Sequence, residues 1–270
     1  MGVSLSINDI KSVTNDMARY KNLDYAGHSF SFLKRRLSHV FLQLKVKRLN
    51  QFSERLSEES FREGIRYHMA VNVTEMFRDP GFWRSLRQTV FPLLKEKQWS
   101  VWFPDTPSGE EVYSFIILLA EDGLLENVKI FSQHASETKC KEIADGFIDH
   151  KNAELNYNNY KRLEEADKFE EYFLEGPGSW TFKKDLLVNC NFIARSVVDS
   201  EIDESFDFIV FRNTCINYTS QSREEMLEKI VSHLNPGGFL ALGVKEALPS
   251  SLESQFKPVD QKESIYKKLC

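Results

Sequence analysis

The segment from Trp99 to Leu119 constrains the fold of this chain more than any other segment. A short apolar strand, Val101 to Phe103, runs into a tight turn with two prolines and one glycine, and a helix then begins near Ser108 or Gly109. In an open parallel sheet, such a turn lies at the carboxyl end of a strand, and the free N–H groups at the helix start face the crevice where ligands bind. The sequence therefore places a candidate ligand site at this turn.

Two carboxylates follow the turn. Glu110 and Glu111 fall in the first turn of the helix, where the helix dipole favours a negative charge by ~0.3–1 kcal/mol. In isolation they are typical of capping residues at the surface. The segments that follow in the chain favour a functional role instead.

Strands and helices alternate downstream of this segment. This order predicts parallel strand pairing with right-handed crossovers, and hence an α/β fold. The predicted strands are Val128 to Ser132, Asp207 to Arg212 and Phe239 to Gly243, and the predicted helices are Glu137 to Ile148 and Glu224 to Leu234.

Two regions depart from this alternation. From Ile7 to about Tyr67, apolar residues recur at spacings of three and four, which predicts helices only. Between Glu170 and Ala194, a Gly-Pro-Gly turn separates short aromatic and β-branched runs, which predicts a small antiparallel insert beside the main sheet. We therefore expect a helical domain and linker over residues 1–75 and a main domain over 76–270, with the insert at about 170–194.

A basic segment lies within the helical region. Six basic residues occur between Lys34 and Arg48, and no acidic residue occurs from Ser31 to Ser53, although the chain is acidic overall. One interpretation is a solvated face whose counter-charges come from another segment. The other is a docking face for an acidic partner.

Composition excludes several classes of function. The net charge of −5 argues against nucleic-acid binding over the whole surface. The four cysteines form no CxxC pair and no histidine stands at metal-ligand spacing, so we expect reduced thiols and no metal site. No apolar run has the length of a signal peptide or a membrane span, which predicts a cytoplasmic protein, and nothing in the pattern demands more than a monomer.

Four polar stretches fall on the carboxyl edge of the predicted sheet. They are Asn72 to Arg78 (NVTEMFR), Ser108 to Ser114 (SGEEVYS), Phe131 to Ser136 (FSQHAS) and Phe211 to Tyr218 (FRNTCINY). In this order and at these spacings, and with the closing NPGGFLALGVKEAL, they resemble the CheR-type methyltransferases of bacterial chemotaxis over nearly the whole chain. Those enzymes transfer a methyl group from S-adenosylmethionine to receptor glutamates.

The resemblance implies a Rossmann-like methyltransferase sheet, S-adenosylmethionine as cofactor with S-adenosylhomocysteine as product, and a helical receptor-like protein as substrate. It also implies roles for individual residues. Glu111 matches the carboxylate that holds the cofactor near its amino group, and Arg212 and Asn213 match the pair that ends the strand beside the sulfonium. The other implied cofactor-binding positions are Asn72, Thr74, Arg78, Gly109, His134, Ser196 and Val197.

Arg78 and Tyr218 are the implied catalytic positions. A glutamate acceptor is ionised at neutral pH, so methyl transfer to it requires no strong base, and catalysis then depends on orientation and electrostatic positioning. A planar guanidinium such as that of Arg78 is suited to hold the incoming carboxylate with two hydrogen bonds. The alternative for Arg78 is a structural salt bridge across the linker.

Three departures from the family pattern fall at the expected cofactor site. The family's first glycine after the opening strand is Asp105 here, and Asp tolerates φ > 0 better than most residues. The family's ribose-binding Asp is His134, preceded by Gln133. Loss of that charged acceptor costs ~1.5–3 kcal/mol unless the imidazole substitutes, in which case the affinity should vary between pH 5 and 8. The tyrosine of the family's RNxxIYF run aligns with Asn217, one residue before Tyr218.

Two functions remain open from the sequence. The first is a protein-glutamate O-methyltransferase, in which the basic segment meets an acidic coiled coil and the insert around Trp180 offers a strand edge to a tethering peptide. The second is a catalytically impaired CheR-like interaction module in a signalling array. The replacement of the family's ribose-binding Asp by His134 suggests this hypothesis.

Overall fold

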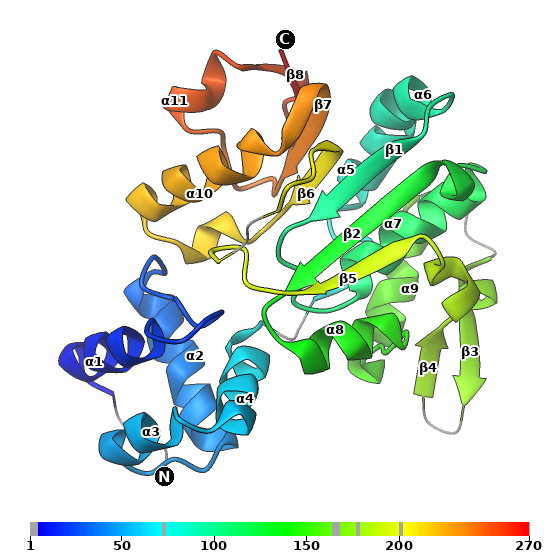
Figure 1. Ribbon diagram of the computed structural model, residues 1–270. Coiled ribbons are helices and arrows are strands. Elements are labelled where there is room, and N and C mark those ends of the chain that lie inside the picture. The colour runs from blue at the N-terminus through cyan, green and yellow to red at the C-terminus, as the bar shows by residue number, and fades with distance from the viewer. Residues whose placement is uncertain (1–4, 72–73, 164–167, 177–178, 200–201, 270) are drawn as a thin grey trace.

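The computed structural model describes residues 5–71, 74–163, 168–176, 179–199 and 202–269 (Figure 1). Within residues 5–71, the apolar faces of the helices pack into a hydrophobic cluster of their own. Side-chain hydroxyls cap two of these helices, at Ser6 and Ser29. The helices predicted here are confirmed as α1 (Ile7–Met17), α2 (Phe30–Gln43), α3 (Leu49–Arg55) and α4 (Glu59–Met69).

The rest of the described chain is built on one mostly parallel sheet. Among the described residues the sheet has seven strands in the order β5-β2-β1-β6-β7-β9-β8. The first five are mutually parallel, and β9 is antiparallel to both of its neighbours. The predicted Rossmann-like α/β fold is therefore confirmed. The strands are β1 (Trp99–Phe103), β2 (Val128–His134), β5 (Cys190–Ala194), β6 (Phe206–Phe211), β7 (Leu234–Leu242), β8 (Phe256–Asp260) and β9 (Ile265–Lys268).

Both faces of this sheet are buried. Val101 and Phe103 of β1 enter one hydrophobic cluster, whereas Trp102 between them enters another. The first cluster includes residues of α5 (Pro80–Ser85) and α7 (Glu110–Glu121), and the second includes residues of α10 (Ser220–Ser232). Because successive strand residues point to opposite faces, burial on both faces makes the strands almost continuously apolar in sequence. Among the described residues, the remaining α-helices are α6 (Phe91–Leu94), α8 (Glu137–Ala144), α9 (Ala153–Lys161) and α11 (Ser250–Glu253), and a π-helical turn spans Leu86–Val90.

The predicted insert is wrong in its second half. A separate antiparallel hairpin is present, formed by β3 (Phe173–Gly176) and β4 (Ser179–Phe182). Its turn residues, 177–178, lie outside the described residues. Cys190 to Ala194, however, pairs with β2 in parallel and forms an edge strand of the main sheet. Its residues are half-exposed or exposed, as is usual for a strand at the edge of a sheet, and the sequence pattern carries no signal that β2 is its partner.

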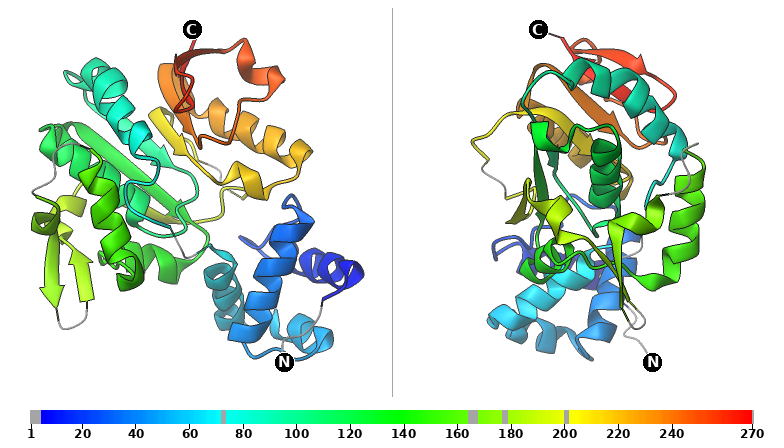
Figure 2. Two further views of the ribbon diagram at one scale, coloured as in Figure 1. Left: turned by 180° about the vertical axis from the view of Figure 1, so that it is seen from behind. Right: turned by 90° about the vertical axis from the view of Figure 1, so that its right-hand side faces the viewer.

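The carboxyl ends of the central strands face the helical part (Figures 1 and 2). The strand order reverses at β1, because β2 lies on one side of it and β6 on the other. Such a switch point forms a crevice outside the strand ends. The helical part contacts the loop after β6, where the amide of Ser29 donates to the carbonyl of Asn217 (2.8 Å) and that of Thr219 donates to Gly27 (3.0 Å). The division into 1–75 and 76–270 stays a prediction.

Candidate functional site

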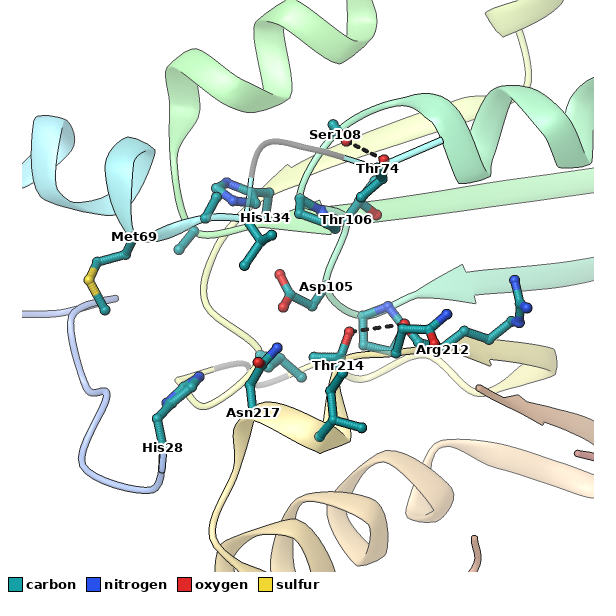
Figure 3. Close-up of a pocket in the computed structure, with 18 of the residues that line it drawn as sticks. His28, Met69, Thr74, Asp105, Thr106, Ser108, His134, Arg212, Thr214 and Asn217 are labelled. Carbon is teal, nitrogen blue, oxygen red and sulfur yellow. Dashed lines mark hydrogen bonds between the residues drawn. The ribbon is translucent and has the colours of Figure 1, made fainter. Parts of the chain in front are cut away.

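A cavity of about 290 Å³ opens at this switch point (Figure 3). Its size is near the lower end of pockets that hold small ligands, about 300 Å³. Asp105, His134 and Asn217, the three departures from the family pattern, line the cavity together with Pro104 and leave it open. The other walls come from the loops after β5 and β6 and from the helical part, including Tyr25 and His28.

The turn after β1 is fixed by its neighbour strand. The amide of Thr106 donates to the carbonyl of Gln133 (2.8 Å), and the hydroxyl of Ser132 donates to that of Thr106 (3.1 Å). Asp105 is not among the described residues with positive φ. The turn therefore needs no left-handed residue at this position, so an aspartate stands there without backbone strain.

Glu111 is held by a buried arginine. Arg212 at the end of β6 donates to Glu111 (2.9 Å) and to Asp79 (2.8 Å), and its guanidinium carbon lies 3.8 Å from the centre of the Phe82 ring. Burial raises the pKa of Glu111, and the charge of Arg212 acts in the opposite direction. The Glu111 side chain keeps 26% of its surface exposed, whereas that of Arg212 is 0% exposed. Glu111 thus retains accessible carboxylate surface, and the guanidinium of Arg212 serves to position it.

Arg78 lines the same cavity and is free of such pairing. Among the residues that the structure describes, its guanidinium has no hydrogen bond and no ion pair, so the alternative of a structural salt bridge is not observed. Its carbonyl accepts a hydrogen bond from the indole of Trp83 (2.8 Å). Its neighbours Phe77 and Asp79 have φ of 53° and 57°. A left-handed backbone conformation at a residue other than glycine costs about 1–3 kcal/mol. Residues with such strained conformations are common at functional sites.

Thr74 ties the linker to the turn before α7. Its hydroxyl lies 2.6 Å from that of Ser108 and donates to Glu110 (2.8 Å). Asn72 lies outside the described residues. Gly109 is required by close packing, because a Cβ at this position would lie 2.2 Å from the ring of Tyr113, whose hydroxyl is fixed to the carbonyl of Ile143 (2.7 Å).

His134 is the last residue of β2, and its neutral imidazole can donate a hydrogen bond into the cavity. Its Nδ1 accepts a hydrogen bond from the amide of Ser136 (2.9 Å), so the neutral ring carries its hydrogen on Nε2. Among the described residues Nε2 has no partner, and the side chain lines the cavity. Burial lowers the pKa of His134 to about 4. The site therefore offers a hydrogen-bond donor where the family offers an accepting carboxylate.

The loop after β6 is organised by Glu246, a residue that the sequence analysis did not single out. Its buried carboxylate accepts hydrogen bonds from the amides of Asn213 (2.7 Å), Gly243 (2.8 Å) and Ile216 (3.1 Å). Asn213 itself has φ of 59°. Only the acid in the closing GVKEAL motif signalled this role, and two of its partners, Asn213 and Ile216, lie 33 and 30 positions away in the chain.

Tyr218 faces the helical part. It is buried, its ring centre lies 4.2 Å from that of His28, and burial raises its pKa well above 10. Its hydroxyl is therefore neutral under ordinary conditions. Ser196 and Val197 line the cavity from the loop after β5, and the amide of Ser196 donates to the side chain of Asn22 (3.0 Å).

Comparison with known proteins identifies the family. Residues 72–265 match the family described as CheR methyltransferase, SAM binding domain. The chain belongs to the CheR methyltransferase family. Its cofactor is therefore S-adenosylmethionine, with S-adenosylhomocysteine as the demethylated product.

Individual relatives of this CheR-family chain are distant. It is 28% identical over 251 residues to the methyltransferase-family protein Cher3 of Pseudomonas putida, with 91% of each chain covered. It is 27% identical over 227 residues to chemotaxis protein methyltransferase 1 of Pseudomonas aeruginosa, covering 79% of this chain and 80% of that one. Among solved structures, the N-methyltransferase NodS of Bradyrhizobium japonicum with S-adenosylhomocysteine aligns with a TM-score of 0.41 and 10% identity over 72% of this chain and 88% of that chain.

The residues of this CheR-family cavity fit the cofactor. The accessible carboxylate of Glu111 suits an ammonium group, and the free Nε2 donor of His134 suits a ribose hydroxyl. Nothing in the described lining closes the space between them. In the part of the chain that the structure describes, no helix is long and apolar enough to cross a membrane.

The pH window predicted for an ordinary histidine is wrong for this site. Because the pKa of His134 is about 4, the ring stays neutral from pH 8 down to pH 5. We therefore expect His134→Gln to change the dissociation constant of S-adenosylhomocysteine by the same factor at every pH from 5 to 8. Calorimetry on wild type and variant measures this factor. A factor that changes with a midpoint near pH 6.5 would contradict this assignment.

Proposed function

We propose that this CheR-family protein is a protein-glutamate O-methyltransferase that acts on a helical, receptor-like substrate. The observation that supports this most is the guanidinium of Arg78, which has no hydrogen bond and no ion pair among the described residues and lines a cavity that also presents Glu111 and His134. Such a guanidinium in the lining of a methyltransferase site suits an anionic acceptor such as a carboxylate.

The proposed roles follow from the contacts. S-adenosylmethionine supplies a methyl group already activated by the sulfonium. Glu111, fixed by Arg212, binds the ammonium end, and the Nε2 hydrogen of His134 binds the ribose. Thr74 fixes the turn before α7 through Glu110. The further cofactor contacts proposed are Asn72, Gly109, Ser196, Val197 and Asn213.

Arg78 orients the acceptor carboxylate with its two parallel N–H groups. The acceptor is already ionised at neutral pH, so no proton has to be removed before transfer. Tyr218 remains neutral and borders the acceptor side of the cavity, where its phenol hydroxyl keeps its proton and can donate a hydrogen bond to the acceptor carboxylate. Positioning therefore accounts for most of the proposed catalysis.

The basic segment supports an acidic partner. Arg36 donates to the carbonyl of Met69 (3.1 Å) and so belongs to the fold. Among the described residues, the other five basic side chains have no acidic partner within salt-bridge distance, so counter-charges from another segment are not observed. The five are Lys34, Arg35, Lys45, Lys47 and Arg48, and all are exposed. We propose this surface, called here the basic face, as the docking site for an acidic helical substrate.

Charge reversal on the basic face is expected to slow methyl transfer without affecting the cofactor. We expect Lys34→Glu with Lys47→Glu to lower kcat/KM for an acidic helical receptor fragment by about tenfold at low salt, and less at high salt. The affinity for S-adenosylmethionine should not change. The matched control is Lys95→Glu with Lys97→Glu, exposed residues remote from this face. Equal effects of both double variants would remove the docking role.

The function itself is tested by transfer of a labelled methyl group. The full chain is incubated with methyl-labelled S-adenosylmethionine and a receptor cytoplasmic fragment. We expect an alkali-labile ester on glutamate and none on a fragment whose acceptor glutamates are replaced by alanine. Label that resists alkali would instead indicate another acceptor group.

The second candidate is a catalytically impaired interaction module. Asp105 and His134 favour it, because both replace groups that line the family's cofactor site. Calorimetry separates the two candidates, since a module without a cofactor site gives no heat with millimolar S-adenosylmethionine or S-adenosylhomocysteine. The hairpin of β3 and β4 stays a proposed edge for a tethering peptide under either candidate.

A further inference from the structure

Asp105 places an uncompensated carboxylate inside the cofactor cavity. It follows β1 by two residues, and Figure 3 shows its side chain directed into the cavity, away from the strand. Among the described residues, the carboxylate has no hydrogen bond and no ion pair. Buried charges in proteins are normally paired, because removing a charge from water without a partner is costly.

Among the described residues, no cation pairs with this charge, although Arg78 lines the same cavity. The guanidinium of Arg212 is engaged by Asp79 and Glu111. Burial alone accounts for the raised pKa of Asp105, about 6, with no contribution from a positive side chain. Asp105 is therefore mostly ionised at neutral pH. Its charge helps to raise the pKa values of Tyr25 and Tyr218, in addition to the larger effect of burial on both.

We propose that Asp105 is a specificity-determining residue that makes the cavity favour the positively charged cofactor over its demethylated product. S-adenosylmethionine carries a sulfonium charge that S-adenosylhomocysteine lacks, and the two otherwise have the same groups. A carboxylate in the same enclosed space attracts the first and is neutral toward the second. A glycine at this position has no side chain and offers no such discrimination.

This discrimination affects turnover as well as binding. A methyltransferase whose product binds as tightly as its cofactor is slowed as the product accumulates. With Asp105 ionised, methyl transfer removes the charge that the site favours, so the product leaves more readily. The inference deepens the proposed function through the cofactor alone, and it does not depend on which acceptor receives the methyl group.

The test is calorimetry on the full chain at pH 7.5 with three probes. These are S-adenosylmethionine, S-adenosylhomocysteine and sinefungin, in which a protonated amine replaces the methylsulfonium. We expect Asp105→Asn to weaken both cationic probes by roughly tenfold, while the affinity for S-adenosylhomocysteine changes by less than about twofold. Asp24→Asn is the matched control, because Asp24 lines the same cavity but accepts a hydrogen bond from the amide of Ala26 (2.9 Å). It should change all three affinities alike.

Three outcomes would overturn the inference: equal changes for charged and neutral probes in Asp105→Asn, no change for any probe, or no binding of any probe to the wild type. Thermal unfolding provides a second measurement, because removing a partly buried, unpaired charge should leave the unliganded variant at least as stable as wild type. Selective weakening together with no ester on the receptor fragment would refute the proposed acceptor and leave this inference standing.

Discussion

Replacing Arg78 by alanine is expected to lower the rate of methyl transfer about 10²-fold, the loss that misplacing a reacting group by about 1 Å can cause, because Arg78 is proposed to orient the acceptor carboxylate. The guanidinium has no partner among the described residues, so its removal breaks no ion pair of the fold. The unfolding free energy should therefore change little. The measurement is single-turnover transfer of labelled methyl to a receptor fragment, with urea unfolding of the same variant.

Arg78→Lys is the control for this prediction. A lysine keeps the positive charge but cannot form two parallel hydrogen bonds with one carboxylate. We expect Arg78→Lys to recover part of the rate of methyl transfer that Arg78→Ala loses, because the charge is kept. The recovery should be incomplete, because lysine orients the acceptor carboxylate less well. Unchanged turnover in Arg78→Ala would remove the role proposed for this residue, whatever the effect of the lysine variant.

Replacing Arg212 by alanine is expected to destabilise the fold by about 3 kcal/mol, the lower range for breaking a buried ion pair. The loss leaves Asp79 and Glu111 without their shared partner, and it leaves a space against the Phe82 ring. The two carboxylates are 29% and 26% exposed, so water relieves part of the cost. The measurement is the free energy of unfolding in urea.

Lys184→Ala is the matched control for Arg212. Lys184 also forms an ion pair, with Asp145 at 2.6 Å, but the two side chains are 63% and 50% exposed. Such a surface pair contributes little to stability, because both charges remain hydrated and are screened by salt. Comparable losses in the two variants would show that burial of Arg212 is not what makes its pairs important.

Sequence patterns predicted the central strands because both of their faces are buried, so each strand appears as an apolar run. The edge strand Cys190–Ala194 was assigned to the insert instead of the main sheet, and β8, in which Lys257 and Pro258 are exposed, was not predicted. Strands at an edge keep polar and proline residues because one side of each has no neighbour to pair with. The helix predicted over Glu137 to Ile148 ends at Ala144, before Gly146, whose φ is 79°.

The sequence predicted where the candidate site lies, at the carboxyl ends of the strands, but not how its side chains are arranged. Glu111, His134 and Asn213 follow or end parallel strands, so their meeting at one crevice follows from topology. The direction of each side chain depends on partners far away in the sequence. Arg212 turns to Asp79, 133 positions away. Glu246 binds amides of another loop, and His28 stacks on Tyr218 from a different part of the fold. Periodicity carries no signal for such pairings.

The most direct test of this account is a crystal structure of the protein with S-adenosylhomocysteine. The account predicts the adenosyl ligand in the cavity at the ends of β1, β2 and β6, with its ammonium group on Glu111 and a ribose hydroxyl within hydrogen-bond distance of Nε2 of His134. A ligand bound elsewhere, or an empty cavity at saturating ligand, would contradict it.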